Sequence, residues 1–147
     1  SATNLEVVLV SIDGKYDRVM WYDASVPKWR QYNTEWSPIL NTLWHLNHKM
    51  GFWLHVKEDC TLIAFGEPQT TTSIQLYAGW NMVGYPARND TWYTVGDLKN
   101  DTGATFVEGF NASAPYLTSV LPDTYVLKKG EGYWVYVSAA TTWTVNW

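Results

Sequence analysis

The chain contains one phrase twice, and this repetition limits the folds open to it. Residues 46–56 read LNHKMGFWLHV, and 81 positions later residues 127–137 read LKKGEGYWVYV. In both copies a glycine precedes a run in which aromatic and aliphatic side chains alternate, and this period of two predicts a half-buried β-strand. We expect Trp53 and Trp134 to point into the core from these strands, because a buried indole usually has a fixed hydrogen-bond partner.

The similarity extends beyond the repeated phrase. Further matches are Thr61 with Thr142, YDASVP (22–27) with FNASAP (110–115), and TNLE (3–6) with TVGD (94–97). The order of the matches is kept while their spacing changes, as in a duplicated unit whose loops vary more than its strands. The sequence therefore predicts a first repeat unit over residues 1–78 and a second over residues 79–147. We expect one compact domain or two intertwined units.

Each unit is expected to begin with a short helix and to continue in strands. Thr3 and Glu6 have the spacing of a capping box, and Gly14 supplies the stop. The second helix, from Thr94 onward, is weaker because Gly96 lies inside it. Strands are predicted at 18–23, 29–32, 51–56, 61–65, 73–78, 80–86, 132–137 and 142–147, with a short helical or irregular stretch at 38–47. The predicted class is mainly β with minor helix, built from two sequence-related halves that share one aromatic-rich core.

The composition excludes several classes of function. Charged residues make up 16% of the 147 positions, below the roughly 25% of an average soluble domain. The net charge is -4 and the ten Lys and Arg are scattered, which argues against nucleic-acid binding. No apolar run reaches the length that crosses a bilayer, so we expect no membrane insertion. The single cysteine, Cys60, excludes an internal disulfide framework and a cysteine-rich metal site.

Catalytic and metal motifs are not found. The sequence has no Gly-x-Ser-x-Gly elbow, no glycine-rich phosphate loop and no His-Glu-x-x-His, so we expect neither an enzyme nor a cofactor. The candidates for a metal site are His45, His48 and His55, because three imidazoles suit Zn or Cu. No carboxylate lies at ligand spacing among them, which favours structural roles for all three. A small hydrolase or a metal protein is therefore ranked below the two non-catalytic hypotheses given at the end of this section.

Residues 27–36, PKWRQYNTEW, are the best candidate for a ligand surface. The candidate ligand-binding side chains are Trp29, Tyr32, Trp36, Arg30 and Gln31. Exposed rings stack on pyranose rings while polar groups bond the hydroxyls, a combination typical of carbohydrate sites. The alternative is that Trp29 and Tyr32 pack across the strands on one another or on Trp21.

A resemblance to a known family joins these features. GWNMVGYP (79–86) followed by LKKGEGYWVYV (127–137) resembles the Gly-Trp-Asn … Gly-Tyr-Pro … Gly-x-Gly-Tyr-Trp-Ile/Val repeats of large secreted and cell-surface proteins of archaea and some bacteria. The first copy resembles the same repeat, although Met50 and Phe52 depart from the usual pattern. Together the copies cover nearly the whole chain. The resemblance implies an extracellular or cell-surface accessory module, and it supplies no catalytic residues.

The leading functional hypothesis is a non-catalytic module that binds carbohydrate by ring stacking, with a polysaccharide or glycan and neighbouring modules of a larger protein as partners. The alternative is a structural or adhesive protein-interaction repeat of a surface layer or a multidomain extracellular protein. The first copy lacks its own Gly-Trp-Asn strand, because residue 1 lies about where that strand should end. We expect either excision from a longer polypeptide or a strand after TTTS (70–73) that serves both units. The alternative is a tandem array in which each folded unit is offset from the sequence repeat.

Overall fold

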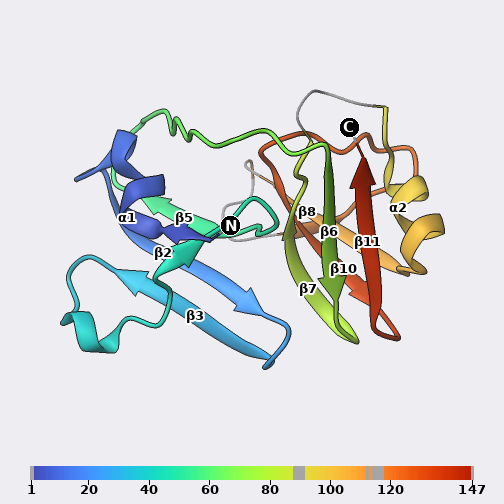
Figure 1. Cartoon of the computed structure of the whole chain (residues 1–147), viewed down its shortest axis with the longest axis horizontal. Helices are drawn as coiled ribbons and strands as arrows, with labels where there is room; N and C mark the ends of the chain where they lie inside the picture. Colours follow the sequence, from blue (N-terminus) through green and yellow to red (C-terminus); the bar gives the residue numbers. More distant parts are fainter. Residues whose placement is uncertain (1, 88–91, 112, 114–117, 147) are drawn as a thin grey trace.

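A computed structural model of the chain describes residues 2–87, 92–111, 113 and 118–146. It is mainly β with two short α-helices in the described residues, which confirms the predicted class. Figure 1 shows two halves side by side, with the blue-to-teal residues at the left and the yellow-to-red residues at the right. A long irregular segment, drawn in green, connects them. The molecule thus has two structural halves, and each contributes its own sheets.

The first half is a three-stranded antiparallel sheet with a small helical cap. Its elements are β1 (Thr3–Asn4), α1 (Leu5–Val8), a 3-10 turn (Val10–Ile12), β2 (Tyr16–Asp23), β3 (Lys28–Asn33), a second 3-10 turn (Pro38–Leu40), β4 (His45–Leu46) and β5 (Trp53–Val56). The strand order of the sheet is β3-β2-β5, and β1 pairs separately with β4. The cap of α1 is Asn4 rather than the predicted Thr3, since Asn4 Oδ1 accepts from the Glu6 amide at 2.9 Å.

The second half contains two sheets and one helix. Its elements are β6 (Thr71–Leu76), β7 (Gly79–Gly84), α2 (Val95–Thr102), β8 (Phe106–Phe110), β9 (Thr118–Val120), β10 (Gly132–Val137) and β11 (Thr141–Asn146). One sheet has the order β7-β10-β8-β9, and the other pairs β11 with β6. In space, therefore, β6 lies with the second half although its sequence falls in the predicted first unit. The strand predicted at 61–65 is wrong, because no described strand pairs with that segment and its backbone is irregular.

The two halves share their pairing order. In the first half β2 lies between its hairpin partner β3 and the later strand β5, and in the second half β8 lies between β9 and β10. The start of each helix is held in the same way. The amide of Leu5 donates to the carbonyl of Trp44 at 2.9 Å, and the amide of Val95 donates to the carbonyl of Tyr125 at 2.9 Å. These common contacts support the predicted duplication.

The matching sequences YDASVP and FNASAP share one local contact, in which an Asx side chain accepts from the serine two residues on. Asp23 Oδ1 accepts from the amide of Ser25 at 3.2 Å and from its hydroxyl at 2.5 Å. Asn111 Oδ1 accepts from the amide of Ser113 at 3.1 Å and from its hydroxyl at 2.6 Å. Short Asx side chains favour such local hydrogen bonds to the backbone two residues on. The sequence match therefore reflects the same pair of side-chain hydrogen bonds in both halves.

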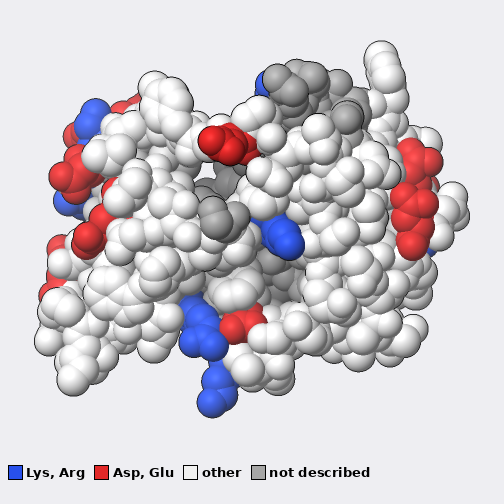
Figure 2. All heavy atoms as spheres, viewed as in Figure 1, with Lys and Arg blue, Asp and Glu red and all other residues white. Residues whose placement is uncertain are grey.

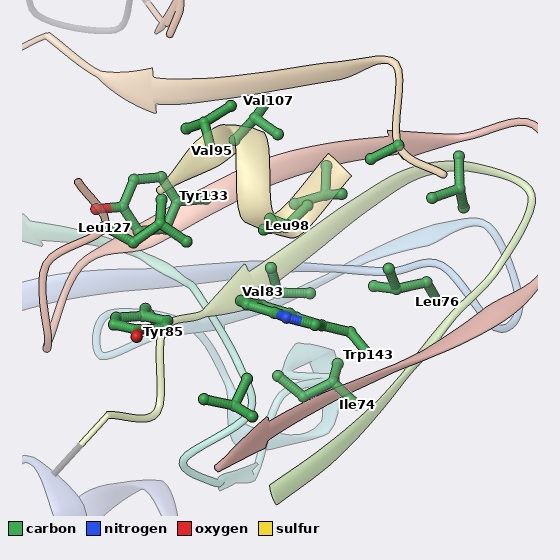
Figure 3. Packing of buried hydrophobic residues seen from close by; sticks show 14 residues of the cluster. Ile74, Leu76, Val83, Tyr85, Val95, Leu98, Val107, Leu127, Tyr133 and Trp143 are labelled. Atoms are coloured by element: carbon green, nitrogen blue, oxygen red, sulfur yellow. The ribbon is translucent and has the colours of Figure 1, made fainter. Parts of the chain in front are cut away.

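The buried side chains form two clusters, so the expectation of one shared core is wrong. The first cluster comprises Leu5, Leu9, Ile12, Tyr16, Val19, Tyr32, Leu43 and Leu46. The second comprises Ile74, Leu76, Val83, Tyr85, Val95, Leu98, Ala104, Val107, Leu127, Tyr133, Val135, Val137, Trp143 and Val145. Figure 3 shows Trp143 among the aliphatic side chains of the second cluster. Each sheet turns one face toward the helix of its own half, and two separate cores result.

The Gly-Trp-Asn sequence has a structural role at the corner between β6 and β7. Asn81 is 2% exposed. Its Oδ1 accepts from the amide of Tyr77 at 2.8 Å, and its Nδ2 donates to the carbonyls of Tyr77 and Gly79 at 2.8 and 3.1 Å. One buried amide thereby satisfies the backbone where the chain passes from one sheet to the other.

Three glycines allow the backbones of the two halves to cross closely. A Cβ on Gly51 would lie 2.4 Å from the carbonyl oxygen of Val83, and a Cβ on Gly84 would lie 2.7 Å from that of Met50. A Cβ on Gly132 would lie 3.0 Å from the Cα of Gly51. The glycine before each repeated strand therefore serves a close approach between the halves.

The first prediction concerns this crossing. Gly51→Ala is expected to lower the free energy of unfolding by about 2 kcal/mol or more, because its methyl group would overlap a backbone carbonyl. The matched control is Gly66→Ala, at a position with nothing within 4 Å and no positive φ, which should change stability by less than about 1 kcal/mol. Urea unfolding followed by circular dichroism measures both. Equal effects of the two substitutions would contradict the crossing.

Candidate functional site

An open groove lies where the two halves meet. Its volume is about 470 Å³, and it is lined by Tyr22, Trp29, Trp80, Glu108, Thr118 and Trp134. These side chains come from β2 and β3 of the first half and from β7, β8, β9 and β10 of the second. The packing of two sheets thus brings together groove residues as far apart in the sequence as Tyr22 and Trp134.

Strand alternation explains why these side chains share the groove. In the first sheet Val19 pairs with Tyr32, and both are buried in the core of their half. Tyr22 pairs with Trp29 three positions along each strand, so this pair lies on the opposite face of the sheet. In β10 the neighbours of Trp134 are buried, and Trp134 itself therefore lies on the outer face. The groove forms where two outer faces meet.

The rings pack edge to face rather than in a plane. The centroids of Tyr22 and Trp29 are 5.5 Å apart with an interplanar angle of 66°, and those of Trp29 and Trp134 are 5.6 Å apart at 72°. Trp80 stands at 89° to Trp134 across 6.4 Å. Such contacts fix the orientation of each ring. Trp29 remains 47% exposed and Trp80 37% exposed, so a ligand meets a corner of nearly perpendicular indoles.

Glu108 and Thr118 supply polar groups on the same lining. Thr118 Oγ1 donates to Glu108 Oε2 at 2.6 Å, which orients the carboxylate. Among the described residues, nothing donates a hydrogen bond to the other oxygen, Glu108 Oε1. Glu108 pairs directly with Trp134 in the β8–β10 ladder. An oxygen that accepts from none of the described residues therefore lies beside an exposed aromatic surface.

An ion pair between buried Asp23 and partly exposed Arg30 holds the end of the hairpin that carries Tyr22 and Trp29. Arg30 Nε donates to Asp23 Oδ2 at 2.7 Å, and Asp23 is 8% exposed. Burial by itself would raise the pKa of Asp23, but hydrogen bonds from Ser25 and Arg30, together with the charge of Arg30, lower it below its ordinary value. The ionised carboxylate is therefore part of what fixes the hairpin.

Of the five side chains predicted to bind a ligand, Trp29 lines the groove. Tyr32 is buried in the first core, and its hydroxyl donates to Glu6 Oε1 at 2.6 Å. That hydrogen bond and then burial raise the pKa of Tyr32. Trp36 is 38% exposed in the turn after β3, and Arg30 is engaged with Asp23. Gln31 fixes the following loop, since its backbone amide donates to the side-chain oxygen of Thr42.

The expectation that Trp53 and Trp134 are locked core residues is wrong. Both are half-buried on outer sheet faces, where Trp134 lines the groove and Trp53 packs edge-on against Phe110 at 5.2 Å. The inward positions of β10 are instead those of Tyr133 and Val135. Strand alternation places Trp134 on one face of the sheet and its sequence neighbours Tyr133 and Val135 on the other. It could not show which face meets the core.

The three histidines do not converge. Among the described residues, no three His, Cys, Asp or Glu side chains are placed to hold a metal ion. His45 is exposed, His48 Nε2 lies 3.2 Å from Thr72 Oγ1, and His55 Nδ1 lies 2.6 Å from Asp17 Oδ1. Burial lowers the pKa of His48, and the charge of Lys49 acts in the same direction. His48 and His55 thus each contact a different polar side chain, and they do not face a common point.

A second hollow of about 430 Å³ lies beside α2. Its acidic groups are already engaged, because Asp97 caps α2 at Thr94 and Asp101 Oδ2 accepts from the hydroxyl of Tyr93 at 2.6 Å. Figure 2 shows acidic side chains gathered over α2 at the right. This hollow is a weaker candidate than the aromatic groove.

No family model, no curated protein and no solved structure matches the chain. The resemblance to the secreted and cell-surface repeats therefore stays a prediction. None of the helices in the described residues combines the length and the apolar character needed to cross a membrane.

The second prediction concerns Asp23. Because its folded pKa is lowered, its contribution to stability is fully present above about pH 4 and is lost as the pH falls through the folded pKa. Asp23→Asn should therefore destabilise the protein at pH 6, and the gap to the wild type should narrow toward pH 2. Thermal unfolding from pH 2 to pH 7 measures this gap.

The matched control is Glu35→Gln, which removes a nearby acid whose side chain makes no hydrogen bond to a described residue. At pH 6 it should change the free energy of unfolding by less than about 0.5 kcal/mol. A constant gap between Asp23→Asn and the wild type at all pH values would show that the ion pair does not fix the hairpin.

Proposed function

We propose that this chain is a non-catalytic module that binds carbohydrate in the aromatic groove. The observation that carries the proposal is the convergence of Trp29, Trp80 and Trp134 with the Glu108 carboxylate in one open hollow. Ligand sites combine apolar walls with a few placed polar groups, and their volumes run from about 300 to 1,000 Å³. The volume of the groove, about 470 Å³, falls in that range.

The mechanism follows from the chemistry of the two partners. A pyranose ring has an apolar C–H face, which stacks on an exposed indole, and hydroxyl groups around its edge, which need acceptors. Trp29 or Trp80 offers the indole, and Glu108 Oε1 offers the acceptor. Because Trp80 and Trp134 are nearly perpendicular, a bound sugar contacts aromatic surface on two sides. This corner favours the end or a branch point of a glycan over the middle of a flat chain.

The lining also supports the non-catalytic part of the proposal. Most glycoside hydrolases use two carboxyl groups that flank the bond to be cleaved. Among the described residues that line the groove, Glu108 carries the one carboxyl group. A module of a secreted or cell-surface protein, as the resemblance implies, would use such a groove to hold an enzyme or an adhesive region near a polysaccharide.

A structural or adhesive repeat is the second candidate function. It is favoured by apolar side chains outside the groove, since Phe65 is 95% exposed and Ile63 is 51% exposed. Isolated exposed apolar residues are common, but neighbouring ones favour contact with another protein. Both functions fit a multidomain extracellular protein, and they use different surfaces of this chain.

The third prediction tests the groove. A panel of polysaccharides and oligosaccharides is screened by affinity electrophoresis, and the best ligand is measured by calorimetry. Trp80→Ala and Trp29→Ala are each expected to weaken binding about tenfold or more, because each removes a stacking surface. Glu108→Gln should weaken binding while keeping the fold, because it removes the negative charge from the acceptor beside the indoles.

The matched control is Trp36→Ala, which removes an indole of similar exposure outside the groove. It should leave the affinity unchanged, and circular dichroism should show that all variants fold. Retention of no glycan on the panel would overturn the proposed function. Unchanged binding in both groove variants would overturn the site.

A further inference from the structure

The two halves differ at one strand edge. In the second half β10 is paired on both sides, by β7 and by β8. In the first half β5 stands at the corresponding position, and among the described residues it is paired on one side only, by β2. An unpaired strand edge presents a row of backbone donors and acceptors and is a template for another strand.

The segment after β5 differs in the same way. In the second half β11 follows β10 and pairs along its whole length with β6. Residues 61–65 correspond to 142–146 in the sequence repeat, but they form no strand. Their position is nevertheless anchored, since the amide of Ile63 donates to Ser11 Oγ at 2.8 Å, beside the helical cap of the first half. The equivalent strand β11 packs beside α2.

Exposure at matched positions measures what is missing from the first half. Val137 in β10 is 1% exposed, whereas Val56, its match in β5, is 39% exposed. Trp143 in β11 is fully buried, whereas its match Leu62 is 37% exposed. The two matched side chains, Val56 and Leu62, are therefore left partly exposed in the first half, and Phe65 in the same segment is 95% exposed.

We propose that this uncovered surface, formed by the free edge of β5 and residues 61–65, docks a strand pair of the β6–β7 type from another repeat unit. The second half shows the arrangement, because there β7 pairs with β10 while β6 pairs with β11. One docked strand extends the first sheet beyond β5. The other converts residues 61–65 into a strand and covers Val56 and Leu62.

The chemistry of the docking segment can be stated from β6 and β7. In β6 every second residue is buried, and its Ile74 and Leu76 side chains join the second core. The buried Asn81 bonds the backbone of Tyr77 at the corner between β6 and β7. The segment therefore contains the side chain that fixes its own corner. A segment with this pattern supplies both the strand edges and the apolar cover that the first half lacks.

This surface shares no residue with the aromatic groove. The proposal therefore stands apart from carbohydrate binding, and either can fail alone. It gives the chain a way to form linear arrays in which each unit completes the sheet of the next one. In such an array the strand edge at β5, which is otherwise an aggregation hazard, is covered.

The test uses the intact chain and a synthetic peptide of residues 71–86, TTSIQLYAGWNMVGYP. Titration is followed by two-dimensional amide NMR and calorimetry. We expect saturable one-to-one binding, with the largest shifts and new hydrogen-exchange protection in β5 and residues 61–65. A scrambled peptide should not bind, because it lacks the inward alternation and the corner.

Substitutions separate specific docking from nonspecific adhesion. Phe65→Lys and Val56→Lys place a charge on the proposed surface and should weaken peptide binding about tenfold or more. Ile39→Lys changes a side chain that is 88% exposed outside this surface and should leave binding unchanged. Because Phe65 is 95% exposed, Phe65→Lys should also leave the free energy of unfolding unchanged, and this keeps the test independent of folding.

Three results would overturn the proposal. One is no binding of the peptide at millimolar concentration. Another is binding in which the shifts fall on β10 and β11, which would mean that the peptide displaces the chain's own strands. The third is dimerisation of the chain alone that Phe65→Lys abolishes, which would assign the surface to a second copy. Light scattering on the chain without peptide reads out this last result.

Discussion

The close crossing of backbones at Gly51, Gly84 and Gly132 is the constraint on which the rest of the structure depends. Side chains at these positions would meet backbone atoms at 2.4 to 3.0 Å, so the halves approach only because the side chains are absent. Two hydrogen bonds accompany the crossing, from the amide of Gly84 to the carbonyl of Lys49 and from the indole of Trp21 to the carbonyl of Met82. The separation of the crossing backbones determines how closely the two outer sheet faces approach each other.

The two faces of each sheet have different tasks. Inner faces form two separate cores, as the position of Trp143 in Figure 3 illustrates. Outer faces meet in an aromatic layer, and the part of that layer left open is the groove. Three consecutive residues of the repeated phrase contribute to both the core and the contact between the halves. Its glycine permits the crossing, its first aromatic residue faces the core side, and its indole, Trp53 or Trp134, faces the other half.

Local chemistry explains which features the sequence could predict. Period-two alternation identifies strands without tertiary information, so the mainly β class and most strand positions were predictable. Trp29 was singled out because aromatic and polar residues are interleaved over residues 27–36, and it does line the groove. Its partners Trp80, Glu108 and Trp134 were missed, since their convergence depends on how two sheets pack across distant parts of the chain. The single core and the strand at 61–65 were wrong for the same reason, because cover and pairing are properties of neighbours in space.

Fluorine NMR can show whether the indoles gathered between the halves form a ligand surface. The protein is labelled with 5-fluorotryptophan, and each signal is assigned by a single Trp→Phe substitution. The glycan that binds best in the panel is then titrated into the labelled protein. We expect the signals of Trp29, Trp80 and Trp134 to shift and those of Trp36 and Trp143 to stay unchanged. A shift confined to Trp36, or no shift at the three groove indoles under saturating ligand, would contradict this expectation.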